Sequence, residues 1–342
     1  MNIAIINNSN NPDMAIYFET KKNINSKKLV FAANAFYCDK DQVHLSSISP
    51  KNKLTWHFFI DCLIGVFLAI KLKFKGIDYL LFDTAHISNI PLAFVAKCLS
   101  LKLVFTIHDW NPHDGNMAGA TRLYNTIVEN FLAHHFVVFS PIETHVPHTV
   151  LNLSGFVPNF SELKPSSQSF LFFGRMQPYK GLHNLIQISE KLKLEMPNAR
   201  INVMGAGSDS AIQTLLQLSN INVVNEFISE DDLNSELRKT TAVILPYNSA
   251  TQSGVIIKSF SMGVPVIAYD VGALNCYIDD GCDGFLVEHG DVDGFVDAMK
   301  DICINFLAFS ERVKINFNEH YSDKALISQY EKLIANLGEN IE

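Results

Sequence analysis

Two cationic side chains lie five residues apart behind a short apolar run in the second half of the chain. The run is Phe170–Phe173, and residues 174–181 follow it with the sequence Gly-Arg-Met-Gln-Pro-Tyr-Lys-Gly before a helical pattern begins. The guanidinium fork of Arg175 and the compact ammonium of Lys180 suit a diphosphate, and the free N–H groups that begin a helix favour the same anion. An ordinary strand–helix turn with solvated cations explains this segment equally well by itself.

A loop of small residues behind a second apolar run, Ala242–Leu245, strengthens the diphosphate interpretation. Residues 249–255 read Ser-Ala-Thr-Gln-Ser-Gly-Val and open a helix that Gly263 ends. Small residues let backbone N–H groups approach an anion closely, and serine or threonine can cap a helix. We therefore predict that this loop is a second arm around the diphosphate that Arg175 and Lys180 hold.

The carboxylates and histidines show no arrangement that is typical of a metal site. Asp291-Val292-Asp293 has the spacing of a metal-binding Asp-x-Asp, but it follows Gly290 and opens a helix, so capping is the preferred interpretation. No histidine–carboxylate cluster has zinc spacing. We expect no metal ion and no cofactor.

Strands and helices that alternate along both halves must position these residues. Such alternation predicts an α/β fold with two doubly wound parallel sheets, and ligands at the carboxyl ends of their strands. The expected strands are Ile3–Ile6, Leu29–Ala32, Tyr79–Phe82, Leu103–Ile107, Phe136–Phe139, Phe170–Phe173, Ile201–Met204, Val223–Phe227, Ala242–Leu245, Pro265–Tyr269 and Phe285–Val287. The expected helices are Leu54–Leu72, Pro91–Leu99, Leu123–Ala133, Leu182–Leu194, Ser210–Leu218, Asp231–Arg238, Gly254–Met262 and Val292–Ile304.

A stretch rich in proline and serine, between Gly155 and Ser169, separates the two halves as a linker does. We predict a first Rossmann-like domain over residues 1–160 and a second Rossmann-like domain over residues 161–320. Residues 321–342 form a C-terminal helix that can pack back towards the first domain.

The charge pattern limits the partners. The net charge of −8 argues against nucleic-acid binding. The first 75 residues are nevertheless rich in lysine, and Lys71, Lys73 and Lys75 follow an apolar helix over Trp56–Ile70 that is too short to span a bilayer. Two interpretations stay open: a crossover helix with ordinary surface lysines, or peripheral contact with an anionic membrane.

The location that we expect is cytoplasmic, with the inner face of the cytoplasmic membrane as the site of any peripheral contact. The N-terminus lacks the features of a signal peptide. The six cysteines have no C-x-x-C spacing, and three of them lie in apolar stretches, which predicts small buried residues in a reducing compartment.

The motifs together resemble the C-terminal domain of glycosyltransferase family 4. The matching pieces are residues 174–181, Met204-Gly205-Ala206-Gly207, Gly263-Val264-Pro265-Val266 and Asp270-Val271-Gly272-Ala273. The resemblance is strong over residues 170–300 and is limited to architecture in the first half. It implies the GT-B fold, in which two Rossmann-like domains face each other across a cleft. By this resemblance the domain over residues 1–160 receives the acceptor, and the domain over residues 161–320 binds the nucleotide sugar. It also implies retaining transfer of a sugar from a nucleoside diphosphate donor, a substrate rather than a cofactor.

The same resemblance implies roles for individual residues. Arg175 and Lys180 would hold the donor diphosphate, and the backbone around Ser253 its distal phosphate. His108, which leaves a strand of the first half, would touch a sugar hydroxyl or steady the reacting centre. The implied catalytic residues are thus His108, Arg175 and Lys180. The implied donor-binding residues are Gly174, Arg175, Lys180, Gly205, Glu226, Phe227, Ile228, Thr251, Gln252, Ser253, Gly254, Val255 and Lys258.

Two positions depart from the family pattern. Many members carry two glutamates separated by seven residues, one beside the sugar and one at the ribose, where this chain has Ala250 and Lys258. Residues 252–254, Gln-Ser-Gly, resemble a sub-branch that lacks both acids. In the retaining mechanism proposed for such enzymes the departing phosphate accepts the acceptor's proton, so no carboxylate base is required.

The activity that we predict is transfer to a glycan or lipid-linked acceptor, independent of metal, in surface polysaccharide or lipopolysaccharide assembly. A catalytically silent nucleotide-sugar-binding subunit is one alternative. A nucleotide-sugar epimerase is another, although it needs a paired acid and base that we cannot assign. A dehydrogenase is disfavoured because no G-x-G-x-x-G follows the first strand.

Overall fold

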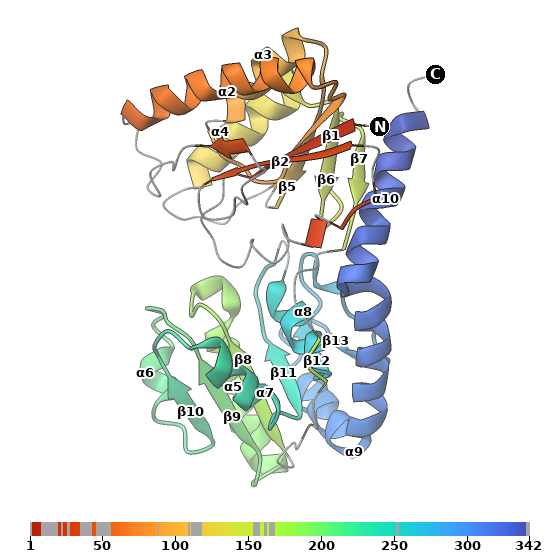
Figure 1. Ribbon diagram of the computed structural model, residues 1–342. Helices are drawn as coiled ribbons and strands as arrows, with labels where there is room; N and C mark the ends of the chain where they lie inside the picture. Colours follow the sequence, from red (N-terminus) through yellow and green to blue (C-terminus); the bar gives the residue numbers. More distant parts are fainter. Residues whose placement is uncertain are drawn as a thin grey trace. The chain divides into compact units, whose positions relative to one another are not determined.

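The chain folds into two compact units, each built on one parallel sheet (Figure 1). Unit 1 comprises Met1–Gly155 with Asp323–Glu342, and unit 2 comprises Phe156–Ser322. The division lies five residues before the predicted one, and the C-terminal helix belongs to unit 1. The computed structural model describes residues 2–7, 20–21, 23–25, 28–34, 43–45, 56–87, 89–108, 110, 118–152, 158–160, 163, 168–250 and 253–339. Residues 28–34, 43–45, 56–62, 118, 120 and 339 are described by their backbone.

Within the residues that the structure describes, the sheet of unit 1 has seven strands in the order β3-β2-β1-β4-β5-β6-β7, all parallel. Chain order reverses between β1 and β4, which makes the sheet doubly wound. Its central strands β4 and β5 are mostly apolar and are buried on both faces apart from Lys102, which begins β5, as parallel strands under helices require. The strands are β1 Asn2–Asn7, β2 Lys28–Asn34, β3 Val43–Leu45, β4 Tyr79–Phe82, β5 Lys102–Ile107, β6 His135–Val138 and β7 His148–Val150.

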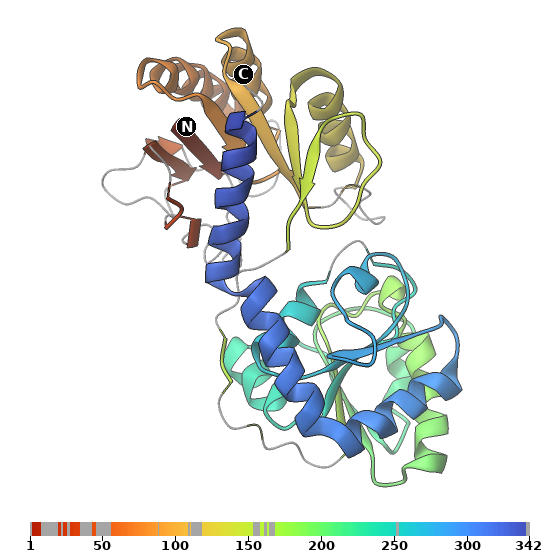
Figure 2. The same cartoon turned by 90° about the vertical axis from the view of Figure 1, so that its right-hand side faces the viewer.

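Helices cover both faces of this sheet. One face packs against α2 (Trp56–Phe74), α3 (Asn89–Cys98), α4 (Ala118–Ile127) and the π-helix η1 (Val128–Leu132). The other face packs against α10 (Asp323–Glu339), which runs along the strands as a long C-terminal helix (Figures 1 and 2). The core of unit 1 therefore has two apolar layers, one on each side of the sheet.

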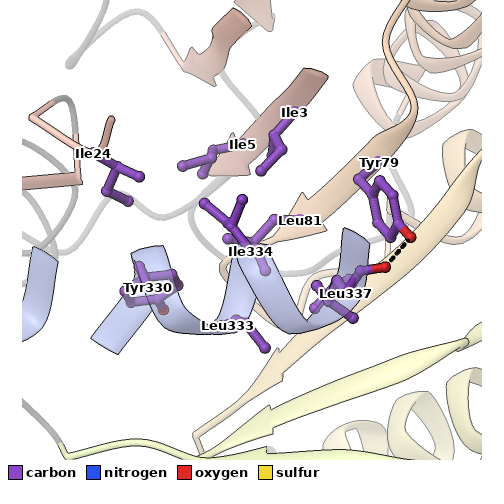
Figure 3. Close-up of a pocket in the computed structure, with 10 residues that line it drawn as sticks. Ile3, Ile5, Ile24, Tyr79, Leu81, Tyr330, Leu333, Ile334 and Leu337 are labelled. Carbon is purple, nitrogen blue, oxygen red and sulfur yellow. Dashed lines mark hydrogen bonds between the residues drawn. The ribbon is translucent and has the colours of Figure 1, made fainter. Parts of the chain in front are cut away.

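The inner face of α10 has the spacing of an amphipathic helix. Leu326, Tyr330, Leu333 and Leu337 recur at three or four residues and meet the sheet around Ile5. Figure 3 shows this contact from close by, with the Tyr79 hydroxyl donating to the Leu337 carbonyl oxygen at 2.8 Å.

Unit 2 repeats the arrangement with six parallel strands in the order β10-β9-β8-β11-β12-β13. The strands are β8 Ser169–Phe173, β9 Arg200–Met204, β10 Ile221–Val224, β11 Ala242–Leu245, β12 Val266–Tyr269 and β13 Gly284–Val287. The helices are η2 Pro178–Lys180, α5 Leu182–Glu195, α6 Ile212–Leu215, α7 Glu230–Leu237, α8 Gly254–Ser261, η3 Leu274–Cys276, α9 Val292–Asn316 and η4 Phe317–Tyr321.

Several element boundaries differ from the sequence-based expectation. The strand expected over Val223–Phe227 ends at Val224, where the Asn225 side chain instead bonds the backbone of the loop after β9. The helix expected over Ser210–Leu218 is confined to Ile212–Leu215, and α9 continues to Asn316 past a non-helical Asn305. The strands β3 and β7 were not predicted, because three residues are too few to show a period.

Asp291 caps α9, because its carboxylate accepts the Gly294 N–H at 2.9 Å. This confirms the capping interpretation of the Asp-x-Asp segment.

Two further expectations concern the helices and the cysteines. Among the described residues, no helix has both the length and the apolar character that crossing a bilayer requires. The four cysteines whose side chains the structure describes are free, and Cys98 and Cys276 are exposed rather than buried. The prediction of buried cysteines is therefore wrong for these two, which end the helix α3 and the 3-10 helix η3.

Candidate functional site

The topological switch point of unit 2 lies between β8 and β11. From β8 the chain continues to β9 and β10 on one side of the sheet, and from β11 it continues to β12 and β13 on the other side. Ligands of doubly wound folds bind at the carboxyl ends of the strands at such a point. Here β8 leads into residues 174–181 and β11 into residues 246–253, the two segments that the sequence singles out. The fold therefore brings both predicted arms to one edge of one sheet.

Close backbone contacts hold the first arm in place. The N–H of Gly174 donates to Met204, and that of Met176 donates to Ala206, both in the segment that ends β9. Gly205 has a φ of +144°, and a β-carbon there would lie 1.9 Å from the Gly174 carbonyl oxygen. Only glycine tolerates both the backbone angle and this approach. The glycines of the Met204–Gly207 segment therefore join the loops after β8 and β9.

Gly181 joins the first arm to the second. Its φ is +69°, and a β-carbon there would lie 1.7 Å from the carbonyl oxygen of Pro246. Next to it, the N–H of Asn248 donates to the Tyr179 carbonyl oxygen at 2.9 Å. The loop after β11 is thus packed directly on the turn that carries Lys180.

Lys180 is buried among aromatic rings. Its ammonium donates to the Tyr247 hydroxyl at 2.5 Å and lies 4.1 Å from the centre of that ring. The side chain of Tyr179 adds a second ring at 5.5 Å. Burial, with the nearby Arg175 guanidinium as a smaller cause, lowers the pKa of Lys180 to about 7. A bound anion would stabilise the charged form of this lysine.

Arg175 is exposed and has no ion pair within the described residues. It lies close enough to Lys180 to lower that lysine's pKa, so the two cations share one site. Two like charges with no carboxylate partner in the described part of the chain form a place where a polyanion is favoured.

The start of α8 completes this site. Ser253 is the N-cap residue with an extended backbone, and Gly254 and Val255 form the first turn. The Val255 side chain lies next to Gly174, because a β-carbon on that glycine would be 3.8 Å from the Val255 Cγ2 atom. The buried Ser253 hydroxyl lies beside that of Tyr247 and makes no hydrogen bond of normal geometry within the described residues. The N-terminal turn of α8, with its free N–H groups, therefore lies beside the loop that carries the two cations.

Lys258 and Ala250, the two residues that depart from the family pattern, both make specific contacts within unit 2. Lys258, on the buried side of α8, forms an ion pair with Glu230 of α7 at 2.9 Å. The Ala250 carbonyl oxygen accepts the Ala273 N–H at 3.0 Å, and a β-carbon on Gly272 would lie 1.9 Å from that oxygen. Ala250 is therefore a packed position beneath the Gly272 turn.

The loop after β10 lies beside the joined loops. Asn225 donates to the Gly207 carbonyl oxygen and accepts the Gly207 N–H, at 3.2 and 3.0 Å. Beyond it Glu226 and Phe227 are exposed, and Ile228 is half-buried. Phe227 is 88% exposed, which leaves its ring available to stack on a planar ligand.

Unit 1 carries a second polar cluster at the switch point between β1 and β4. Asp83, directly after β4, forms a fully buried ion pair with Lys21, whose ammonium lies 4.3 Å from the centre of the Tyr330 ring on α10. Burial lowers the pKa of Lys21 to about 8, although the Asp83 carboxylate opposes this effect.

His108 lies at the same edge of unit 1, after β5. Its Nε2 atom is 3.1 Å from the Asp83 carbonyl oxygen. Because a carbonyl oxygen only accepts, Nε2 carries the ring proton. Burial lowers the pKa of His108, which favours the neutral form of the ring, although the Asp83 carboxylate opposes this effect.

The predicted site residues thus fall into three groups. Unit 2 brings together Gly174, Arg175, Lys180, Gly205, Ser253, Gly254 and Val255, with Glu226, Phe227, Ile228 and Lys258 on the adjoining loop and helix. His108 belongs to unit 1. Thr251 and Gln252 lie outside the described residues.

Three buried residues were missed from the sequence: Tyr247, Lys21 and Asp83. The signal that could have indicated Tyr247 is its position two residues after the apolar strand β11, at the same sheet edge as the loop of Lys180.

Residues 167–305 match the family described as Glycosyl transferases group 1. This region contains the whole cluster of unit 2. The chain is also 26% identical over 202 residues to the D-inositol 3-phosphate glycosyltransferase of Paenarthrobacter aurescens, covering 54% of this chain and 49% of that protein. It is 25% identical over 179 residues to the N-acetyl-alpha-D-glucosaminyl L-malate synthase of Bacillus anthracis, covering 50% and 46%. The matches therefore span about half the length of these curated relatives.

Solved structures show the fold. The lipopolysaccharide outer core galactosyltransferase WaaB is similar over 98% of this chain and 99% of its own, with a TM-score of 0.68 and 16% identity. Sucrose-phosphate synthase from Thermosynechococcus elongatus is similar over 99% and 100%, with a TM-score of 0.70 and 14% identity. HepE of Anabaena, solved with UDP-glucose, is similar over 98% and 100%, with a TM-score of 0.67 and 14% identity. The two α/β units have the GT-B fold.

Proposed function

We propose that the chain is a glycosyltransferase that moves a sugar from a nucleoside diphosphate donor to a glycan or lipid-linked acceptor, with retention at the anomeric carbon. The observation that carries this proposal is the cluster of Arg175, Lys180 and the first turn of α8 at the switch point of unit 2. It provides positive potential for a diphosphate inside the region that matches the glycosyltransferase family. Neighbouring folds solved with UDP support this choice of ligand class.

The chemistry follows from where charge develops. The bond between the anomeric carbon and the donor's phosphate oxygen breaks, and the electron pair leaves with the nucleoside diphosphate. Arg175, Lys180 and the N–H groups of α8 are placed to stabilise that charge. The acceptor oxygen bonds to the anomeric carbon on the face that the phosphate leaves, and its proton passes to the departing phosphate oxygen. This route needs no carboxylate at the packed position of Ala250.

We further propose that transfer is independent of a divalent metal, because the two cations and the helix N-terminus supply the potential that a metal ion would otherwise provide. His108 is our candidate for a contact with a sugar hydroxyl, since a neutral ring with a fixed Nε2 proton suits hydrogen bonding. Four free cysteines fit the cytoplasmic location that we propose. Surface polysaccharide or lipopolysaccharide assembly is the setting that we propose.

Thermal shift with a panel of UDP- and GDP-sugars tests the binding half of the proposal, since a ligand that binds the folded state raises the melting temperature. We expect one donor to stabilise the wild type. Arg175→Ala should weaken that binding by roughly 1.5–3 kcal/mol, because a charge-assisted contact is lost.

Lys193→Ala is the matched control, because Lys193 is an exposed lysine of unit 2 on α5. No shift with any donor, or equal losses in both variants, would remove the basis of the site assignment.

A catalytically silent donor-binding subunit is the second candidate. Ala250 and Lys258 favour it, because they stand where many family members have two acids and Lys258 is engaged in an ion pair with Glu230. Donor binding without product, in the presence of acceptors, would select this candidate over the enzyme.

A further inference from the structure

Helix α2 has two apolar faces. Leu68, Ala69 and Leu72 are buried against the sheet of unit 1, as a crossover helix requires. On the solvent side a second stripe recurs every three or four residues, which places its members within about 60° around the helix. These residues are Leu63, Phe67, Ile70 and Phe74, with exposed fractions of 62%, 72%, 37% and 89%. A soluble crossover helix has no need of this second stripe, which amphipathic packing would fill with polar residues.

Lysines flank the exposed stripe. Lys71 and Lys73 lie about 80° from its centre on either side, given the helical rotation of about 100° per residue. Both are exposed, and neither has an ion pair within the described residues. Over residues 63–102 five lysines are exposed, while Asp78 is the one exposed acid there. The apolar stripe thus lies within a locally cationic surface, although the net charge of the chain is −8.

The surface continues over the neighbouring helices of the same layer. Gly65 of α2 packs on Leu92 of α3, since a β-carbon on the glycine would lie 3.2 Å from the Leu92 Cβ atom. Phe94 and Lys97 lie one turn apart on α3, and Phe94 is 62% exposed. The Lys97 ammonium donates to the carbonyl oxygen of Phe131, itself 68% exposed, at 2.7 Å. Lysines and exposed aromatic rings therefore alternate across three elements.

We propose that this outer surface of α2, α3 and η1 docks on an anionic phospholipid surface. Helix α2 lies along the membrane plane, with Phe67 and Phe74 at the headgroup–acyl boundary and Lys71 and Lys73 on lipid phosphates. An apolar stripe with lysines on both sides matches a membrane surface, because the anionic phosphates lie outermost and the apolar acyl chains lie beneath them. The docking requires no helix to cross the bilayer.

Vesicle co-sedimentation of the full chain tests the inference. Wild type should sediment with phosphatidylcholine vesicles that contain about 30 mol% phosphatidylglycerol and stay in the supernatant with phosphatidylcholine alone. Raising the salt to about 0.5 M should weaken binding through screening.

Substitutions locate the surface. Lys73→Gln with Phe74→Gln should reduce partitioning at least about tenfold, since it removes one surface cation and one inserted ring. Replacing Lys71, Lys73 and Lys75 together by glutamine should have a similar effect. The matched control is Lys193→Gln with Leu194→Gln, an exposed lysine–apolar pair near the end of α5 in unit 2, where Leu194 is 79% exposed.

Three outcomes would overturn the proposal. Wild type could remain in the supernatant with strongly anionic vesicles. The control pair could lower binding as much as the α2 pair. A concentration-dependent dimer that Phe67→Gln with Phe74→Gln abolishes, without any vesicle binding, would assign the stripe to a second copy of the chain. Circular dichroism of each variant separates loss of binding from loss of fold.

Discussion

At the scale of single residues, Lys180 is the most informative group of the candidate site. Its ammonium is held by Tyr247 among aromatic rings, and burial together with Arg175 lowers its pKa to about 7. A lysine with this pKa changes charge near neutral pH, whereas an exposed lysine does not. The sequence predicted the lysine but not its environment, because the tyrosine is 67 residues away along the chain.

This pKa predicts how diphosphate binding depends on pH. In the free protein Lys180 loses its proton as pH rises through about 7, and a bound diphosphate raises its pKa again. The affinity for the diphosphate is then highest below pH 7 and falls as the pH rises above 7, by at most about tenfold per pH unit. Calorimetric titration with the best-binding nucleoside diphosphate from pH 7 to pH 9 checks this expectation.

Lys180→Arg is the comparison, because its guanidinium stays charged over this pH range. The nucleotide titrates in the same way with both proteins, so the difference between the two pH profiles reports the titration of Lys180 alone. Parallel pH profiles for wild type and Lys180→Arg would show that Lys180 does not meet the diphosphate.

At the scale of elements, the site depends on loops held together by backbone contacts. Gly205 and Gly181 permit approaches that a β-carbon would block, and they fix the loops after β8, β9 and β11 as one surface. The glycine motifs could be found in the sequence. The close contacts that require glycine could not be predicted, because each contact joins residues of different loops that only the sheet order brings together.

Gly205→Ala tests this element-level account. A β-carbon would lie 1.9 Å from the Gly174 carbonyl oxygen at a φ of +144°, so we expect a loss of about 2–3 kcal/mol in the free energy of unfolding. Urea unfolding measures it. Gly290→Ala is the control, because its φ is +89° with nothing within 4 Å, and backbone strain alone should cost about 1 kcal/mol. Equal losses would contradict the importance of the close approach.

At the scale of the whole molecule, alternating apolar runs predicted two doubly wound sheets, and both have the strand order that such sheets require. Long periodic segments were therefore predictable. The edge strands β3 and β7 were not, since three residues show no period. The buried Lys21–Asp83 pair was also beyond prediction, because it joins residues 62 apart in a segment with no motif.

The C-terminal helix α10 completes the core of unit 1. The last helix packs on unit 1, although unit 2 precedes it directly in the chain. We predicted a C-terminal helix over residues 321–342 that can pack back towards the first domain, and α10 covers one face of the sheet of unit 1. Its Tyr330 ring lies over Lys21, so the C-terminal residues help to bury the polar cluster next to His108.

The most direct test of the central claim is product formation with the donor that binds best and a panel of glycan and lipid-linked acceptors. We predict that wild type releases the nucleoside diphosphate, that the product keeps the donor's anomeric configuration, and that a strong chelator changes neither. Arg175→Ala should lower kcat/KM by about 10- to 150-fold, while Lys193→Ala leaves it unchanged. Donor binding without release for every acceptor, or activity lost on chelation and restored by magnesium or manganese, would contradict this account.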